Sequence, residues 1–132
     1  MAVSLCLTRL VMERLVKSGV GWRIGWNTHA REFKGLVGTD NWCVELTELE
    51  LNEFCRLLTQ LANTMAQLAT ELMPEEKIAC EAESDVMWME VEGYPHTYGL
   101  RFILNTGRCV EGEWHSEAVP QLLQAVSMLK VF

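Results

Sequence analysis

The sequence predicts an α+β fold made of two consecutive units, each an antiparallel sheet followed by a helix. Short runs in which apolar and polar side chains alternate, as in a half-buried strand, occur before residue 47 and again after residue 77. Each group of runs is followed by a segment whose apolar residues have helical spacing. The order indicates strands, a long helix, four strands and a C-terminal helix. We interpret this order as a distant structural duplication.

Three strands are expected before the long helix. The first, residues 22–26, places three large side chains on one face: Trp22, Ile24 and Trp26. The second covers residues 32–37 and is closed by turn residues at 38–41. The third, residues 42–46, alternates again.

The long helix has the clearest start signal in the chain. Thr47-Glu48-Leu49-Glu50 matches a capping box, in which the threonine hydroxyl and the glutamate carboxylate each satisfy a backbone amide. The helix should run to about Leu72 and end before Pro74. Its apolar residues form three columns: Leu51, Leu58, Met65 and Leu72; Phe54, Leu61 and Leu68; Cys55, Ala62 and Ala69. This stripe is wider than one sheet face needs, so we expect it to pack on a sheet and also on another helix, from this chain or from a second subunit.

The second half repeats the strand pattern four times. The expected strands have alternating side chains in residues 78–83 and 87–92, in 98–104 and in 110–114. A hairpin signal, Asn105-Thr106-Gly107-Arg108, separates the last two. Ser116 is the expected N-cap of the final helix. That helix places five apolar residues on one side: Val119, Leu122, Leu123, Val126 and Leu129.

Length and composition predict one ordered domain. The chain has 132 residues, of which 49% are hydrophobic and 22% charged. We expect residues 12–132 to form the domain, with halves at about 12–73 and 74–132. Residues 1–11 are interpreted as an upstream start or a frayed tail, so that translation begins at Met1 or at Met12.

Cysteine usage and hydropathy predict a soluble, cytoplasmic protein. The five cysteines are scattered, without a Cys-x-x-Cys pair, which favours reduced thiols. The longest uncharged run, residues 57–70, contains several polar residues, so no membrane span is expected. No secretion signal is recognised at the amino terminus.

The net charge of −7 is distributed unevenly. Residues 1–34 hold six basic and two acidic residues, whereas residues 35–132 hold five basic and sixteen acidic ones. An acidic surface repels phosphate backbones, so tight nonspecific binding of nucleic acid is not expected unless a local basic face is present.

From Lys17 onward the chain resembles a cyanobacterial family of unknown function, DUF1818. The resemblance covers nearly all of residues 12–132. Its motifs lie at residues 17–26, 35–38, 42, 45–47, 54–58, 80–85, 92–96 and 118–120. It implies a fold similar to the single-stranded-DNA-binding transcriptional regulators of the Whirly type, in which sheet-plus-helix units repeat and pack through their helices. It also implies single-stranded nucleic acid as an alternative ligand.

Three groups of residues are candidate sites. Glu81, Glu83 and Asp85 form an acidic strip near which Glu90, Glu92, Glu111 and Glu113 could lie; such carboxylates can hold a cation, but a solvated strand face is the favoured interpretation. The second half can assemble one cysteine–histidine group, Cys109 with His96 and His115. A thiol beside a base is the arrangement that nucleophilic catalysis requires.

The third group is basic and aromatic. Arg23, Arg31 and Lys34 alternate with Trp22, Trp26 and Phe33, and Arg101 and Arg108 are counted with them as candidate nucleic-acid contacts. The three aromatic residues lie at core-facing positions, which favours a structural role for them.

These observations predict a noncatalytic binding module without a metal or other cofactor. Its expected partner is another protein or a second copy of the chain, bound through the long helix or a sheet face. The alternative is weak binding of single-stranded nucleic acid in a transcription-related role.

Overall fold

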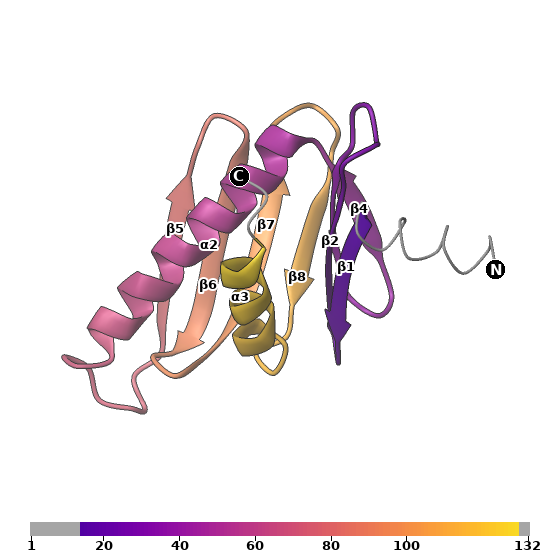
Figure 1. Cartoon of the computed structure of the whole chain (residues 1–132). Coiled ribbons are helices and arrows are strands. Elements are labelled where there is room, and N and C mark those ends of the chain that lie inside the picture. Colours follow the sequence, from indigo (N-terminus) through magenta and orange to yellow (C-terminus); the bar gives the residue numbers. More distant parts are fainter. Residues whose placement is uncertain (1–13, 130–132) are drawn as a thin grey trace.

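The computed structural model describes residues 14–129 as two four-stranded antiparallel sheets and two helices (Figure 1). The predicted α+β class is confirmed. The elements are β1 Arg14–Gly19, β2 Trp22–Asn27, β3 Gly35–Gly38, β4 Cys43–Leu46, α2 Glu48–Leu68, β5 Ile78–Glu83, β6 Met87–Tyr94, β7 Thr97–Leu104, β8 Glu111–Trp114 and α3 Val119–Met128. The predictions for residues 1–11 lie outside the described part of the chain. Within residues 14–129, no helix is long and apolar enough to cross a membrane.

Sheet A has the strand order β1-β2-β3-β4, so the expectation of three strands before the long helix is wrong. The additional strand is β1. Its register places Lys17 opposite Ile24 and Gly19 opposite Trp22, on the inward side of the sheet. A lysine and a glycine at inward positions remove the apolar alternation that identifies a strand from sequence.

The strand expected over residues 32–37 begins only at Gly35. The backbone N–H of Asn27 donates to the carbonyl of Lys34 at 2.7 Å, which closes the loop between β2 and β3 just before that point. Gly35 then packs directly against α2, where an added Cβ would lie 2.9 Å from the Cβ of Leu51.

α2 begins where its capping box predicts. Thr47 Oγ1 accepts from the N–H of Glu50, and Glu50 Oε1 accepts from the N–H of Thr47. The expected end at Leu72 is wrong, because the helix ends at Leu68. After Leu68 the backbone forms 3₁₀-type hydrogen bonds between residues three apart. Thr70 N–H donates to the Gln67 carbonyl, and Glu71 N–H donates to the Leu68 carbonyl.

Sheet B has the order β5-β6-β7-β8 and confirms the four strands expected in the second half. Ser116 is not the N-cap of the final helix. α3 follows Ala118, whose side chain makes no capping bond, and a turn closed from Ala118 N–H to the His115 carbonyl separates β8 from the helix. Pro120 lies in the first turn of α3, where a backbone N–H would have no intrahelical partner.

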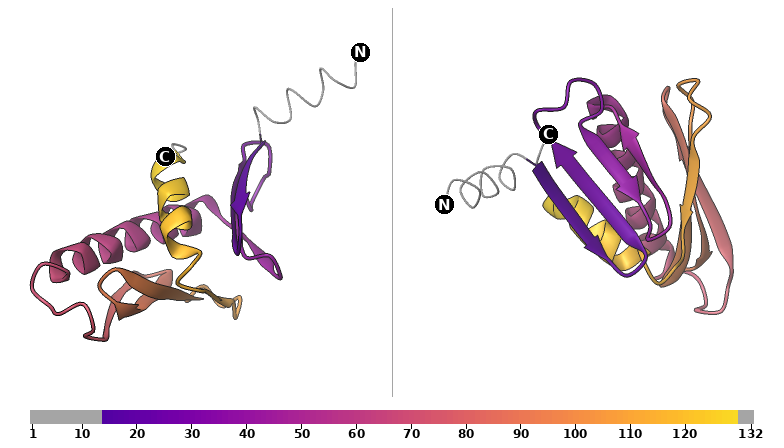
Figure 2. Two further views of the ribbon diagram at one scale, coloured as in Figure 1. Left: turned by 90° about the horizontal axis from the view of Figure 1, so that it is seen from below. Right: turned by 90° about the vertical axis from the view of Figure 1, so that its right-hand side faces the viewer.

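The two helices lie in the angle between the two sheets (Figure 2). α2 contacts β5 and β6 of sheet B, β3 and β4 of sheet A, and α3. An aromatic cluster of Trp42, Phe54, Phe102 and Trp114 joins the layers, with neighbouring ring centroids 5.2–5.6 Å apart. Trp114 Nε1 also donates to the Gly38 carbonyl at 2.8 Å, linking β8 to β3. The wide apolar stripe of α2 therefore packs on both sheets and on a helix of the same chain.

Candidate binding face

The outer face of sheet B points away from both helices. Alternation along the strands turns Met89, Val91, Leu100 and Phe102 inward, where they are buried. The residues between them face outward. The outward charged residues are Glu81 and Glu83 of β5, Glu90 and Glu92 of β6, Arg101 of β7, and Glu111 and Glu113 of β8. This face, called the acidic face below, therefore carries six carboxylates and one guanidinium.

The strand register aligns these charges in rows. Glu81 lies directly opposite Glu90, Glu90 opposite Arg101, and Arg101 opposite Glu113. Arg101 Nη2 is 3.3 Å from Glu90 Oε1, and the guanidinium lies 5.0 Å from the ring centroid of Trp88. Trp88 Nε1 in turn donates to Glu81 Oε2 at 3.3 Å. Arg101 offsets part of the charge of its own row, and Lys77 Nζ, just before β5, lies 4.0 Å from Glu92 Oε1. The acidic face keeps an excess of carboxylates.

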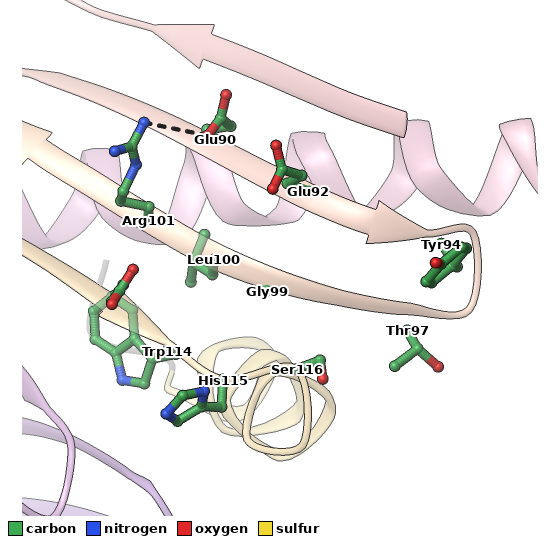
Figure 3. A pocket seen from close by; sticks show the side chains of 11 residues that line it. Glu90, Glu92, Tyr94, Thr97, Gly99, Leu100, Arg101, Trp114, His115 and Ser116 are labelled. Carbon is green, nitrogen blue, oxygen red and sulfur yellow. Dashed lines mark hydrogen bonds and ion pairs between the residues drawn. The ribbon is translucent and has the colours of Figure 1, made fainter. Parts of the chain in front are cut away.

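A hollow of about 580 Å³ lies at one end of the acidic face (Figure 3). Glu90, Glu92 and Glu113 line its acidic side, and His115 lies at its border. Gly99 has no side chain to fill the space beside Glu92, its cross-strand neighbour. The hollow is therefore a recess bordered by carboxylates.

A second hollow, of about 760 Å³, lies where the two halves of the chain meet. It shares Glu113 and His115 with the first and adds Asp40 and Glu117. The acidic surface thus continues from sheet B toward the turn between β3 and β4.

The family model described as "Domain of unknown function (DUF1818)" matches residues 17–129. The chain belongs to this family. A similar solved structure is the crystal structure, at 1.80 Å resolution, of a protein of unknown function from the DUF155 family of Prochlorococcus sp. NATL2A, a cyanobacterium. It is 24% identical to this chain, covers 87% of this chain and 98% of its own, and has a TM-score of 0.83. At this identity the likeness concerns the fold. No curated protein matches the chain.

Two of the three residues of the acidic strip take the position that alternation predicts. Glu81 and Glu83 lie exposed on the acidic face, whereas Asp85 lies beyond the end of β5 in the connection to β6. No three His, Cys, Asp or Glu residues in the described part of the chain are arranged to hold a metal ion.

The cysteine–histidine group does not assemble. Leu104, at one end of β7, bonds to Val110 next to Cys109, whereas His96 precedes the other end of that strand. His115 follows Trp114, which pairs with Leu100 nearer the His96 end. Thr97–Leu104 thus separates Cys109 from His96, and these residues form no nucleophile–base pair.

The five candidate cations occupy three places. Arg23 donates to the carbonyls of Thr39 and Trp42 at 2.8 and 3.1 Å, which holds the turn between β3 and β4. Arg101 belongs to the acidic face. Arg31, Lys34 and Arg108 lie at the other end of sheet A, around the loop from β2 to β3.

Arg108 connects this loop region to the start of α2. Its Nη1 lies 2.6 Å from Oε1 of buried Glu50, and its guanidinium lies 4.6 Å from the ring centroid of Phe33. Thr106 Oγ1 donates to the other carboxylate oxygen of Glu50 at 2.8 Å. Lys34 lies 5.9 Å from the ring centroid of Trp26. Two cation–aromatic pairs therefore occur in this region.

Sequence reasoning missed the hollow at Gly99 and the contact between Trp88 and Arg101. The contact requires the register of two neighbouring strands, which no local pattern specifies. The alternation of Glu81 with Glu83 and of Glu90 with Glu92 was the signal that could have located the acidic face.

Proposed function

We propose that the chain is a noncatalytic binding module that docks a basic segment of a partner protein on the acidic face of sheet B. The observation that carries this proposal is the alignment of six glutamates and one arginine on the outer side of a sheet whose inner side supplies the core. A flat face dominated by one sign of charge attracts and orients a partner of the opposite sign.

The alignment of like charges supports a role in binding. Carboxylates directly opposite each other on neighbouring strands destabilise a sheet, and Glu81 faces Glu90 in this way. Bound lysine or arginine side chains would relieve that repulsion. A basic partner thus gains more from this face than from the same number of dispersed carboxylates.

The packing of α2 favours the sheet face over the long helix as the docking surface. Leu51, Leu58 and Met65, the three residues of one apolar column that lie within α2, are fully buried inside the chain. Self-association through this helix would require those contacts to open. The partner we propose is therefore a different protein rather than a second copy joined through α2.

A labelled oligolysine peptide tests the proposal by fluorescence anisotropy with the full chain. We expect binding that weakens with salt, and about tenfold weaker binding in the variant Glu90→Gln/Glu92→Gln/Glu113→Gln. The matched control, Glu71→Gln/Glu75→Gln/Glu76→Gln, removes the same charge from exposed residues between α2 and β5. It should change the affinity less than about twofold. Equal losses in both variants would show that only the total charge matters and would contradict the proposal.

Single-stranded nucleic acid is a second candidate ligand. The Lys34–Trp26 and Arg108–Phe33 pairs support it, because cations beside aromatic rings bind phosphates and stacked bases. The repeated order of four strands and a helix supports a likeness to the Whirly-type regulators. Arg31→Ala/Lys34→Ala should then weaken the binding of a labelled oligonucleotide at low salt; an unchanged anisotropy of the wild-type chain on titration would contradict this second function.

We also propose that the protein is cytoplasmic. The cysteines in the described part of the chain, Cys43, Cys55, Cys80 and Cys109, are free thiols, which supports a reducing compartment.

A further inference from the structure

β5 forms one edge of sheet B. It is the first strand in the order β5-β6-β7-β8, so β6 is its only neighbour among the described strands. α2 contacts β5 from the inner side of the sheet. The right-hand view of Figure 2 shows β5 at the outer limit of the sheet, with no other described element beyond it. One side of β5 is therefore a free strand edge.

Three residues of β5 turn their backbone groups to this free edge. Ser84 N–H donates to the Met87 carbonyl at 2.8 Å, so Ser84 bonds toward β6. In an antiparallel ladder, residues that bond to one neighbour alternate with residues whose amide and carbonyl groups point the other way. Counting back from Ser84, the residues that point away from β6 are Glu83, Glu81 and Ala79. Within residues 14–129, no side chain or loop bonds to these backbone groups.

The same three residues turn their side chains to the acidic face. Ala79, Glu81 and Glu83 are exposed there. Glu81 accepts one bond, from neutral Trp88, and Glu83 has no ion-pair partner in the described part of the chain. A strand placed at this edge would therefore find free main-chain groups and two carboxylates at the same positions.

The charge of this edge disfavours pairing with a second copy of the chain. If two β5 edges paired antiparallel around Glu81, the two Glu81 side chains would stand directly opposite each other. Like charges in that position destabilise a sheet, and charged side chains on edge strands prevent identical edges from associating. A strand with lysine or arginine at these positions would instead form cross-strand pairs of opposite charge.

We infer that an extended basic segment of the partner adds a strand to sheet B, antiparallel to β5 and beside Ala79–Glu83. Lysine or arginine residues of this segment stand opposite Glu81 and Glu83 on the outer side. Main-chain bonds to β5 hold the segment, and the side-chain pairs select its sequence, as in other cases of strand addition. This inference rests on the proposed function and specifies where the acidic face receives its ligand.

The inner side of the edge selects small apolar residues between the basic ones. Side chains alternate along the added strand, so the residues between the lysines lie beside Cys80 and Ala82. Cys80 is half-buried and packs against the core, and α2 covers this side of β5. A valine or alanine would cover Cys80, whereas a charged side chain would lie against the helical layer. The expected ligand alternates basic and small apolar residues.

A capped hexapeptide that alternates lysine and valine tests this inference. In an antiparallel pair with β5, the residues opposite Glu81 and Glu83 exchange main-chain bonds with them, so the lysine amides face β5 and the valine amides face solvent. N-methylation of a central lysine amide should weaken binding to the full chain about fivefold. N-methylation of a central valine amide, the matched control, should change the affinity less than about twofold. Fluorescence anisotropy measures both values.

Amide hydrogen exchange measured by NMR provides the second readout. The unmodified peptide should slow exchange at Glu81 and Glu83 by more than about tenfold, whereas Cys80, which bonds toward β6, should change little. Equal affinities of the two methylated peptides, or unchanged exchange at Glu81, would overturn strand addition and leave docking on the acidic face intact. Failure of the wild-type chain to bind the unmodified peptide would overturn both.

Discussion

Sheet A and sheet B have the same topology but different outer faces. Each has four antiparallel strands in sequential order, and each turns its inner face toward α2 and α3. On the outer side of sheet A, the register aligns Val16, Gly25, Leu36 and Glu45 in one row. The corresponding side of sheet B carries six glutamates. The fold therefore permits either surface, and the charge of sheet B is not needed to form a sheet of this kind.

Arg23 and Arg101, one from each sheet, show the same difference. Arg23 of sheet A donates to two backbone carbonyls, so its charge serves the turn between β3 and β4. Arg101 of sheet B contacts Glu90 and Trp88 on an open surface. The first arginine is used within the fold, whereas the second stands among the carboxylates of the acidic face, where we propose that a partner docks.

A cavity in the helical layer between the two sheets should cause the largest loss of stability. Leu58 is fully buried at the centre of α2, so Leu58→Ala leaves a cavity and should lower the free energy of unfolding by about 2–5 kcal/mol. Gln60→Ala, on the exposed side of the same helix, should change it by less than about 0.5 kcal/mol. Chemical denaturation measures both values. Equal midpoints would contradict the assignment of the helix faces.

A second experiment compares a buried cysteine with an exposed one through the pH dependence of stability. Burial raises the pKa of Cys55 from 9.0 to about 12, whereas Cys43 is exposed on the outer side of sheet A. The folded thiol therefore stays protonated while the unfolded thiol ionises. The contribution of Cys55 to the free energy of unfolding is complete below pH 9 and is lost as pH rises toward 12. The loss amounts to about 2–4 kcal/mol.

Cys55→Ala should remove this pH dependence, and Cys43→Ala should retain it. Denaturant titrations at pH 8 and pH 11 measure the difference between each variant and the wild type. Burial also raises the pKa of Tyr98 and acts in the same direction, so the comparison between variants is needed to isolate the thiol. A Cys55→Ala chain that loses stability in parallel with the wild type would contradict the assignment.

The sequence predicts most of the fold because its signals are local. The capping box of Thr47 and Glu50 locates the start of α2, and alternation locates the strands of sheet B. β1 is hidden because Lys17 occupies an inward position at an edge strand. The end of α2 is misplaced because the apolar columns continue after the backbone has changed to tighter turns at Thr70.

The candidate site is predictable only in part. Alternation places Glu81 and Glu83 on one face, but their alignment with β6 and β8 depends on register. The recess at Gly99 depends on where β8 ends, which is set by the turn at Ala118. Arg23 lies close in sequence to Arg31, yet its bonds hold carbonyls 16 and 19 residues away and draw it into a different role.

The smallest expected effect is that of Glu81→Lys on stability, and it tests whether the carboxylates of the acidic face serve binding or stability. Glu81→Lys converts the facing pair Glu81–Glu90 from like to opposite charges, and should raise the free energy of unfolding by about 0.2–1 kcal/mol at low salt. High salt should reduce the gain, because both groups are near solvent. The same variant should bind oligolysine less tightly, since it places a cation on the proposed docking surface. A gain in stability with a loss of affinity would show that the carboxylates are retained for the partner; a variant that is less stable would show that Glu81, through its bond from Trp88, serves the sheet instead.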